Sequence, residues 1–230
     1  MDVDFRPSSN LFEMLHTQSA ADVIAKEGKV VVCPAFESIT IATCPETITS
    51  LKELVDNGQA EGFHQSHFPQ GHGPTRFDTF WEKSLNCPTT SSTSTNEDAN
   101  DYFWKERYSI RHEELFEPYI VMASGDIPLC DERFQGYGLN KISHLASVAA
   151  VLKGGEYLVL PGVFLVAPTH ERSESWGKIY GNAKSDENKR NKLALKNLFS
   201  DFQSNLRKGR PPVVSESTLA MQQLVSKSIE

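Results

Sequence analysis

The stretch Asp131–His144, DERFQGYGLNKISH, combines a tight turn with the beginning of a helix. Gly136 and Gly138 stand on either side of an aromatic residue, which is typical of a turn where the backbone closely approaches another group. Apolar residues at helical spacing follow the turn and predict a core-facing helix. Lys141 and His144 are three residues apart, so we expect them on one face near the start of this helix.

Apolar runs on both sides of this stretch predict further strands and helices. Strands are expected in short β-branched or aromatic runs, at residues 29–33, 116–122, 156–160 and 163–166. Helices are expected where apolar residues recur at helical spacing, at residues 11–15, 47–56, 139–152 and 186–206. In the helix at 47–56, Ser50 and Glu53 are expected to form a capping box, and Asn57-Gly58 would end it.

Two segments have the composition of disordered chain. Residues 86–101 are a low-complexity tract of Ser, Thr, Asn and Asp, which cannot bury enough apolar surface to order itself. From Arg207 onward, a Pro-Pro pair and many polar residues indicate a mobile tail. The prediction is therefore one partial domain over residues 1–206, interrupted by a disordered surface insertion at 86–101, with a flexible tail over 207–230.

Composition excludes several classes of function. A net charge of −7 without a long basic run argues against nucleic acid or an anionic membrane as the main partner. No segment approaches the length of a membrane span, and the first residues lack the layout of a signal peptide. The four cysteines show no C-x-x-C spacing, which disfavours a zinc knuckle. An even number of cysteines permits disulfides in a secretory lumen without requiring them.

The run Met1–Phe5 contains a D-x-D pattern formed by Asp2 and Asp4. If this run ends a strand, the two-residue period places both carboxylates on one face. Carboxylate oxygens suit Mg²⁺ or Mn²⁺, and such an ion usually keeps open positions for substrate phosphates. An acidic pair at a chain start is, taken alone, more often a solvated turn, so the metal hypothesis depends on the rest of the chain.

The segment Phe63–Thr75 is predicted to be a loop rich in Gly, Pro and His. Its three histidines, His64, His67 and His72, could in principle bind zinc. No Cys or acidic partner lies at a suitable spacing, and we favour a loop that lines a polar cleft.

Several blocks of the sequence, taken in order, resemble glycosyltransferase family 49, which includes LARGE-type and Golgi β-1,4-glucuronyltransferase-like enzymes. The blocks lie at residues 2–8, 31–37, 71–75, 116–119, 131–144 and 159–161. The resemblance extends from residue 2 to about residue 205 and is interrupted by the tract at 86–101. Ordered blocks of this kind are far more specific than any one of them.

The resemblance implies an α/β fold of GT-A type, a mixed sheet flanked by helices. It also implies that Asp2 and Asp4 hold Mn²⁺, with Mg²⁺ possible, against the diphosphate of a UDP-sugar. His170 matches a family histidine and is the expected third metal ligand. This chain departs from the family pattern at Ala167, where the family has another histidine.

Family members of this type invert the anomeric centre, and a base must deprotonate the acceptor hydroxyl. Asp131 is the preferred candidate and Glu132 the alternative, although a turn cap is an equally good interpretation of Asp131. The remaining residues that the resemblance assigns to substrate binding are His72, Gly136, Tyr137, Gly138, Asn140 and Lys141.

The expected function is metal-dependent transfer of a glucuronyl or related hexosyl group from a UDP-sugar to a glycan acceptor, in the Golgi. The alternative is a non-catalytic relative that binds glycans or acts as a scaffold, favoured by the departure at Ala167. In GT-A folds the strands before the D-x-D hold the nucleotide, and here one residue precedes Asp2. We therefore expect a truncated chain without its N-terminal nucleotide-binding strands, whose full-length parent could carry a membrane anchor.

Overall fold

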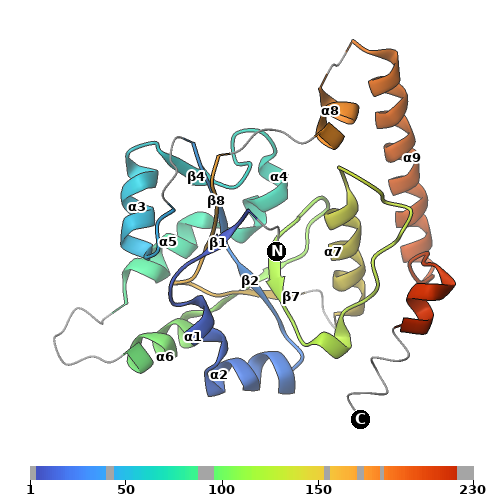
Figure 1. Ribbon diagram of the computed structural model, residues 1–230. Helices are drawn as coiled ribbons and strands as arrows, with labels where there is room; N and C mark the ends of the chain where they lie inside the picture. Colours follow the sequence, from blue (N-terminus) through green and yellow to red (C-terminus); the bar gives the residue numbers. More distant parts are fainter. Residues whose placement is uncertain are drawn as a thin grey trace. The chain divides into compact units, whose positions relative to one another are not determined.

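The computed structural model describes residues 4–39, 44–87, 96–152, 156–169, 174–181 and 184–221, and it divides into two compact units. Unit 1 comprises Met1–Asp126 and Leu152–His170, and unit 2 comprises Ile127–Val151 and Glu171–Glu230. Figure 1 shows the helices and strands and labels several of them in each unit. Strands parallel and antiparallel to their neighbours, with flanking helices, define a mixed α/β fold, as predicted.

Unit 1 contains two four-stranded sheets, with strand orders β1-β8-β3-β4 and β5-β7-β2-β6. The strands are β1 (Arg6–Pro7), β2 (Val30–Cys33), β3 (Ala35–Ser38), β4 (Ala60–Gly62), β5 (Tyr108–Arg111), β6 (Tyr119–Val121), β7 (Glu156–Val159) and β8 (Leu165–Ala167). The pairs β2–β7 and β3–β8 are parallel, and the other pairs are antiparallel. Four of these strands, β2, β6, β7 and β8, confirm the sequence prediction.

The chain start is joined to the first sheet by side-chain and backbone bonds as well as by β1. Arg6 pairs with Val166 in an antiparallel register. Just beyond β1, the N–H of Ser8 donates to the carbonyl oxygen of Phe164 at 2.9 Å, and Ser8 Oγ accepts from the N–H of Phe164 at 3.2 Å. These bonds hold the segment that follows Asp4 against the strand that leads toward residue 170.

The helices of unit 1 cover its sheets and close its core. They are α1 (Leu11–Leu15), α2 (Gln18–Ala20), the π-helix η1 (Ala21–Lys26), α3 (Ile48–Asp56), α4 (Pro69–His72), the 3₁₀ helices η2 (Gly73–Thr75) and η3 (Ser124–Asp126), α5 (Phe77–Leu85) and α6 (Asn96–Glu106). Figure 1 shows α3 and α5 beside the β4 end of the first sheet. The capping box of α3 differs from the prediction, because Thr47 and Ser50 form it, one turn before Ser50 and Glu53.

The helix α6 corrects the prediction of disorder over residues 86–101. Residues 96–101 form the first part of α6, while 88–95 lie outside the described residues. The helix is fixed from its apolar end, where the buried Trp104 donates from Nε1 to the carbonyl oxygen of Met14 at 3.1 Å. Asn100 is also buried. Contacts of Trp104 with a distant helix therefore extend order into a tract whose own composition does not favour it.

Unit 2 is helical, with α7 (Asn140–Val151), α8 (Glu174–Tyr180) and α9 (Asp186–Arg207). Ser185 is the N-cap of α9, and its side chain accepts a hydrogen bond from the N–H of Asn188. Its core face packs Phe199 and Phe202 against Phe134, with ring centroids 6.4 and 5.6 Å apart. The predicted helices at 139–152 and 186–206 are confirmed by α7 and α9.

The predicted flexible tail over 207–230 is described as far as residue 221. Residues 211–215 have no regular secondary structure, and residues 216–221 are helical, while 222–230 lie outside the described residues. Hydrogen bonds join Val213, Ser215 and Thr218 to Asp131 and Glu132. No helix in the described part of the chain has both the length and the apolar character needed to cross a membrane.

Candidate functional site

Asp4 is the described member of the D-x-D pattern, and it lies two residues before β1. The next residue, Phe5, is buried and packs its ring 4.9 Å from that of Phe63 and 4.5 Å from that of Tyr119. Burial of Phe5 fixes the backbone directly beside the half-buried Asp4. Asp2 lies outside the described residues.

The second part of the predicted metal site is the end of β8. Ala167, the position where the family has a histidine, is buried as the last residue of this strand. Asp4 lies two residues before the start of β1, and Thr169 lies two residues after the end of β8. The two strands pair in an antiparallel register. The register therefore directs both segments to the same end of this strand pair.

The metal set Asp2, Asp4 and His170 stays a prediction, because Asp2 and His170 lie outside the described residues. Within the described ranges, no three His, Cys, Asp or Glu side chains converge as metal ligands. Asp4 alone supplies the hard oxygen atoms that Mn²⁺ or Mg²⁺ prefers, which is compatible with the expected ion.

The predicted loop Phe63–Thr75 folds partly into α4 and η2, and its histidines have separate environments. His64 stacks on Phe63, with its Nδ1 3.7 Å from a carboxylate oxygen of Glu117. His67 shares a hydrogen bond with Ser66 at 2.6 Å. His72 is only 2% exposed, and its ring lies 6.2 Å from that of Tyr119. This burial gives His72 the environment of a core residue, and its predicted contact with substrate stays untested.

The carboxylate of Asp131 is enclosed, with 1% of its side chain exposed. It accepts hydrogen bonds from Nε of Arg133 at 2.9 Å, from Nη2 of Arg133 at 2.8 Å and from the Arg133 N–H at 3.1 Å. It also accepts from the N–H of Val213 at 3.3 Å. Burial alone would raise the pKa of Asp131, but the bonds from Arg133 and Val213 outweigh burial and hold it below its usual value.

These contacts are those of a structural carboxylate that closes a turn. A general base needs a free lone pair directed at its substrate, whereas the oxygens of Asp131 already accept four donors. The role of Asp131 as base stays a prediction, and the turn-cap interpretation has direct geometric support. The sequence signal for its partner is the D-x-R spacing, which places Arg133 within reach of the turn.

Glu132, the alternative base, is exposed but also occupied. Its carboxylate accepts from the N–H of Ser215 at 2.8 Å and from the hydroxyl of Thr218. The bond from Thr218, followed by that from Ser215, lowers the pKa of Glu132. Both partners come from the segment after α9, more than eighty residues along the chain, which no local pattern around Glu132 could indicate.

Gly136 and Tyr137 line a pocket of about 320 Å³ in unit 2. The other lining residues come from α8, α9 and the turn itself: Arg133, Gln135, Lys178, Ile179, Asn191, Ala194, Leu195 and Leu198. Tyr137 meets Tyr180 edge to face, with ring centroids 6.0 Å apart. Two predicted substrate-binding residues are thus in the wall of a cavity that carries cationic side chains.

Gly138 is required for packing rather than for lining this pocket. Its φ is +103°, and a Cβ at this position would lie 2.9 Å from Cδ2 of Leu195 on α9. The predicted close approach of the backbone is therefore confirmed, and the group approached is a helix of the same unit.

Asn140 and Lys141 begin α7, as the spacing predicts, with Asn140 exposed and Lys141 half-buried. The carbonyl oxygen of Asn140 accepts from Ser143 Oγ at 2.9 Å. In the same helix, Nδ1 of His144 is buried and has no hydrogen-bond partner among the described residues, and burial lowers its pKa. His144 is therefore neutral at neutral pH.

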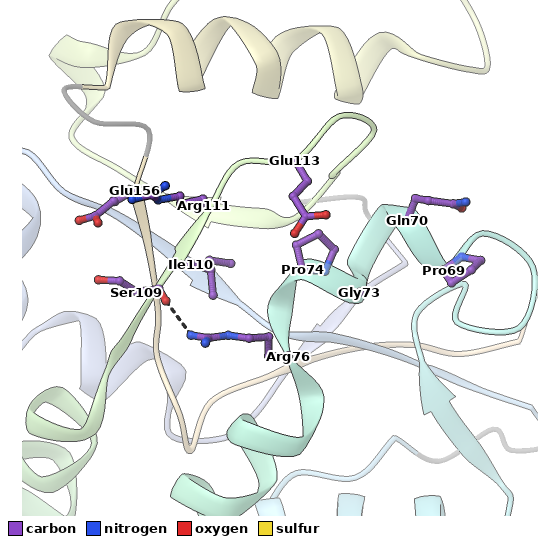
Figure 2. A pocket seen from close by; sticks show the side chains of 10 residues that line it. All are labelled: Pro69, Gln70, Gly73, Pro74, Arg76, Ser109, Ile110, Arg111, Glu113 and Glu156. Atoms are coloured by element: carbon purple, nitrogen blue, oxygen red, sulfur yellow. Dashed lines mark hydrogen bonds between the residues drawn. The ribbon is translucent and has the colours of Figure 1, made fainter.

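A larger cleft in unit 1, of about 650 Å³, is lined in part by the segment Phe63–Thr75, for which the sequence predicted a loop that lines a polar cleft (Figure 2). Its lining residues are Pro69, Gln70, Gly73, Pro74, Arg76, Ser109, Ile110, Arg111, Glu113 and Glu156. Nη2 of Arg76 donates to the carbonyl oxygen of Ser109 at 2.6 Å, and its guanidinium lies 5.1 Å from the ring centre of Tyr108. The lining residues from Ser109 to Glu156 come from segments distant in sequence, which no motif in the loop indicates. None of the predicted site residues lines it.

The predicted site residues thus divide between the units. Asp4 and His72 belong to unit 1, and the residues from Asp131 to Lys141 belong to unit 2.

Comparison with known proteins identifies the family. The sequence profile of the family described as "Glycosyl-transferase for dystroglycan" matches residues 1–207. The chain therefore belongs to this family, glycosyltransferase family 49, as its ordered blocks predicted. Xylosyl- and glucuronyltransferase LARGE1 of Gallus gallus is 28% identical over 206 residues, which is 89% of this chain and 23% of the relative.

Two further relatives show the same pattern. LARGE1 of Homo sapiens is also 28% identical, over 89% of this chain and 23% of its own length. LARGE2s of Danio rerio is 30% identical over 173 residues, which is 75% of this chain and 20% of the relative. The chain spans less than a quarter of the length of these relatives.

Proposed function

We propose that this chain acts in a glycosyltransferase that moves a glucuronyl or related sugar residue from a UDP-sugar to a glycan acceptor, with inversion and with a divalent metal. The observation that carries the proposal is the family match over residues 1–207. The similar LARGE1 proteins are named xylosyl- and glucuronyltransferases, which favours these two sugars as donors. The same relationship favours the Golgi as the place of action.

The pairing of β1 with β8 supports the proposed metal site. Asp4 and Thr169 flank this pair at the same end, which is compatible with a shared metal site for Asp2, Asp4 and His170. These residues would hold Mn²⁺, or Mg²⁺, through carboxylate and imidazole groups. A bound ion of this kind neutralises the charge that develops on a leaving diphosphate.

The pocket beside Gly136 and Tyr137 supports a substrate-binding role for the turn. Arg133 and Lys178 supply positive charge to its wall, and Tyr137 supplies an aromatic face. Sugar rings have apolar faces that pack on aromatic rings, and their anionic groups pair with cations. The proposed role of this chain's residues is to bind and orient the sugar, while Glu132 or Asp131 accepts the proton of the acceptor hydroxyl.

The second candidate function is a glycan-binding relative without catalysis. Ala167 favours it, because a family histidine is replaced there by a buried methyl group that cannot ligate a metal.

The test measures Mn²⁺ binding and UDP release on the full chain with UDP-glucuronate and UDP-xylose. The variant Asp2→Ala with Asp4→Ala is expected to lose Mn²⁺ binding and to release UDP at a rate lowered beyond the ~10–100-fold that loss of an outer-shell metal partner costs. Asp22→Ala is the matched control, since Asp22 is an acidic residue of unit 1 that pairs with Lys26 on the surface. Unchanged Mn²⁺ binding in the double variant would refute the metal assignment. Glycan binding without UDP release would favour the second candidate.

A further inference from the structure

Residues 211–218, here called the C-terminal strap, are attached to the Asp131-Glu132 pair by backbone and side-chain bonds. The N–H of Glu132 donates to the carbonyl oxygen of Val213 at 2.8 Å, and the N–H of Val213 donates to Oδ2 of Asp131 at 3.3 Å. One backbone bond and one bond from the backbone to a side chain therefore attach Val213 to the turn.

The strap also occupies the Glu132 carboxylate. The N–H of Ser215 donates to Oε2 at 2.8 Å, and the hydroxyl of Thr218 donates to Oε1. Ser215 Oγ lies 3.5 Å from Oε1 and 3.1 Å from Thr218 Oγ1, so the hydroxyl groups support one another. Each oxygen of Glu132 therefore has a donor from the strap.

Removal of the strap would affect the two carboxylates differently. Asp131 would keep its three bonds from Arg133, and it would remain a structural group. Glu132 would lose the bonds from Ser215 and Thr218 that occupy its side chain. Release of the strap would therefore free the carboxylate of Glu132. Asp131 would lose only the bond from Val213 and would stay occupied by Arg133.

Most of the hydrogen bonds that attach the strap lie at the protein surface. Val213 is 48% exposed, so burial of its side chain does not anchor the segment. Exposed hydrogen bonds are individually weak, and segments held by them open locally without global unfolding. The strap lies beyond residue 207, where the family match ends, although it binds residues of a family block.

We propose that the C-terminal strap is an autoinhibitory segment, whose release frees the Glu132 carboxylate to accept the proton of an acceptor hydroxyl. In that transfer the acceptor oxygen bonds to C1 of the sugar, the bond from C1 to the diphosphate oxygen breaks, and the hydroxyl proton moves to Glu132. The inhibitory role rests on the proposed function, whereas the contact between strap and Glu132 does not.

Carboxyl labelling with a carbodiimide and an amine, read by peptide mass spectrometry, measures the contact directly. The variant Ser215→Pro with Thr218→Val removes the two closest donors. It is expected to increase the labelling rate of Glu132 at least about fivefold and to leave Asp131 unlabelled, because the bonds from Arg133 persist. A chain ending at Gly209 should give the same increase. Ser217→Ala is the control, since its hydroxyl bonds Ser215 and not Glu132. Equal labelling of Glu132 in all chains would overturn the proposal.

UDP release then tests inhibition. The double variant and the shortened chain should release UDP at least about fivefold faster than the parent, and Glu132→Gln in either background should abolish the gain. If the parent releases UDP and neither the double variant nor the shortened chain does so faster, the inhibitory role is overturned, and the proposed function is not. Absence of UDP release from every chain would overturn both the proposed function and the inhibition, and increased labelling would still identify the contact.

Discussion

Asp131 and Arg133 form the most enclosed ion pair in the described part of unit 2, with 1% and 28% of their side chains exposed. Arg133 also donates to Asp201 at 2.6 Å, and its hydrogen bonds to the carboxylates of Asp131 and Asp201 raise its pKa further. The guanidinium is therefore charged at every accessible pH. Its position depends mainly on Asp131, and it forms part of the pocket wall beside Tyr137.

Replacement of Asp131 by asparagine is expected to lower the free energy of unfolding by about 2 kcal/mol, since bonds to a charged group are lost in a buried place. Urea unfolding followed by helical circular dichroism measures the change. Asp201→Asn is the control, because Asp201 bonds the same arginine from a side chain that is 57% exposed. It should cost less than about 1 kcal/mol. Equal costs for the two variants would contradict the role given to Asp131.

The same pair predicts a pH dependence. The pKa of Asp131 in the folded chain lies below its ordinary value of 3.8. Its contribution to stability is therefore complete above that ordinary value and is lost as pH falls through the folded pKa. The stability advantage of the parent over Asp131→Asn should therefore shrink as pH falls below 3.8. Unfolding titrations at several pH values measure this difference, and an advantage that does not shrink below pH 3.8 would contradict the assignment.

Gly162 lies where a side chain would collide with the ring of Phe103. Its φ is +77°, and a Cβ there would lie 2.5 Å from the ring of Phe103. Gly58 has a φ of +67° with nothing within 4 Å of a built Cβ, so it is a matched control. Gly58→Ala should cost about 1 kcal/mol from the backbone alone. Gly162→Ala should cost about 1–3 kcal/mol more, because the ring must move. Thermal unfolding of both variants tests the difference, and equal costs would refute the packing explanation.

The pairing of β1 with β8 has consequences for the proposed site. Ser8→Ala removes the acceptor of the buried N–H of Phe164, which should lower the free energy of unfolding by about 1–3 kcal/mol. Since Asp4 lies two residues before β1, the affinity for Mn²⁺ should also fall. Isothermal titration with Mn²⁺ and urea unfolding measure the two effects.

Ser9→Ala is the control for Ser8→Ala. Ser9 Oγ donates to the carbonyl oxygen of Glu46 at 3.1 Å on the exposed side of the same segment. Its removal should change stability by no more than about 0.5 kcal/mol and should leave Mn²⁺ affinity unchanged. A similar loss of affinity in both variants would show that the pairing does not carry the metal site.

Elements with a strong local pattern were predictable. The apolar run of β2, which is buried along its whole length, and the periodic faces of α7 and α9 each give a clear signal within their own residues. The order of α6 was not predictable, since Trp104 anchors it to Met14, ninety residues away along the chain. Short strands such as β3 and β4 depend on partners, and their own few residues carry little pattern.

For the candidate site, the sequence identified the segments but not the partners of the side chains. The turn around Gly136 and the helix after it were expected, and both are present. The bonds from Val213 to Asp131 and from Ser215 to Glu132 join positions separated by 82 and 83 residues. Such pairs are set by tertiary structure, so a base could not be chosen from the motif alone.

The four cysteines, all among the described residues, form no disulfide, so their reaction with a thiol reagent reports on their burial. Cys33 is buried in β2, and burial raises its pKa to about 12. Cys130 is exposed at the start of the unit 2 turn. An aromatic disulfide reagent should therefore react with Cys130 in the folded chain and with Cys33 only after unfolding. Mass spectrometry of labelled peptides distinguishes the two cysteines. The unfolded chain in denaturant is the control, in which all four thiols should react. Early labelling of Cys33 would contradict this core.

The long separation between paired strands bears on how the chain is made. Ser8 bonds Phe164 across 156 residues, and β2 and β3 take β7 and β8 as their parallel partners. During synthesis, the edges of β2 and β3 that pair with β7 and β8 must therefore stay open until residues 156–167 have left the ribosome. For much of that interval these apolar strands are available to other nascent chains. The strand order itself therefore predicts a need for chaperone protection in the interval between synthesis of β2 and β3 and synthesis of β7 and β8.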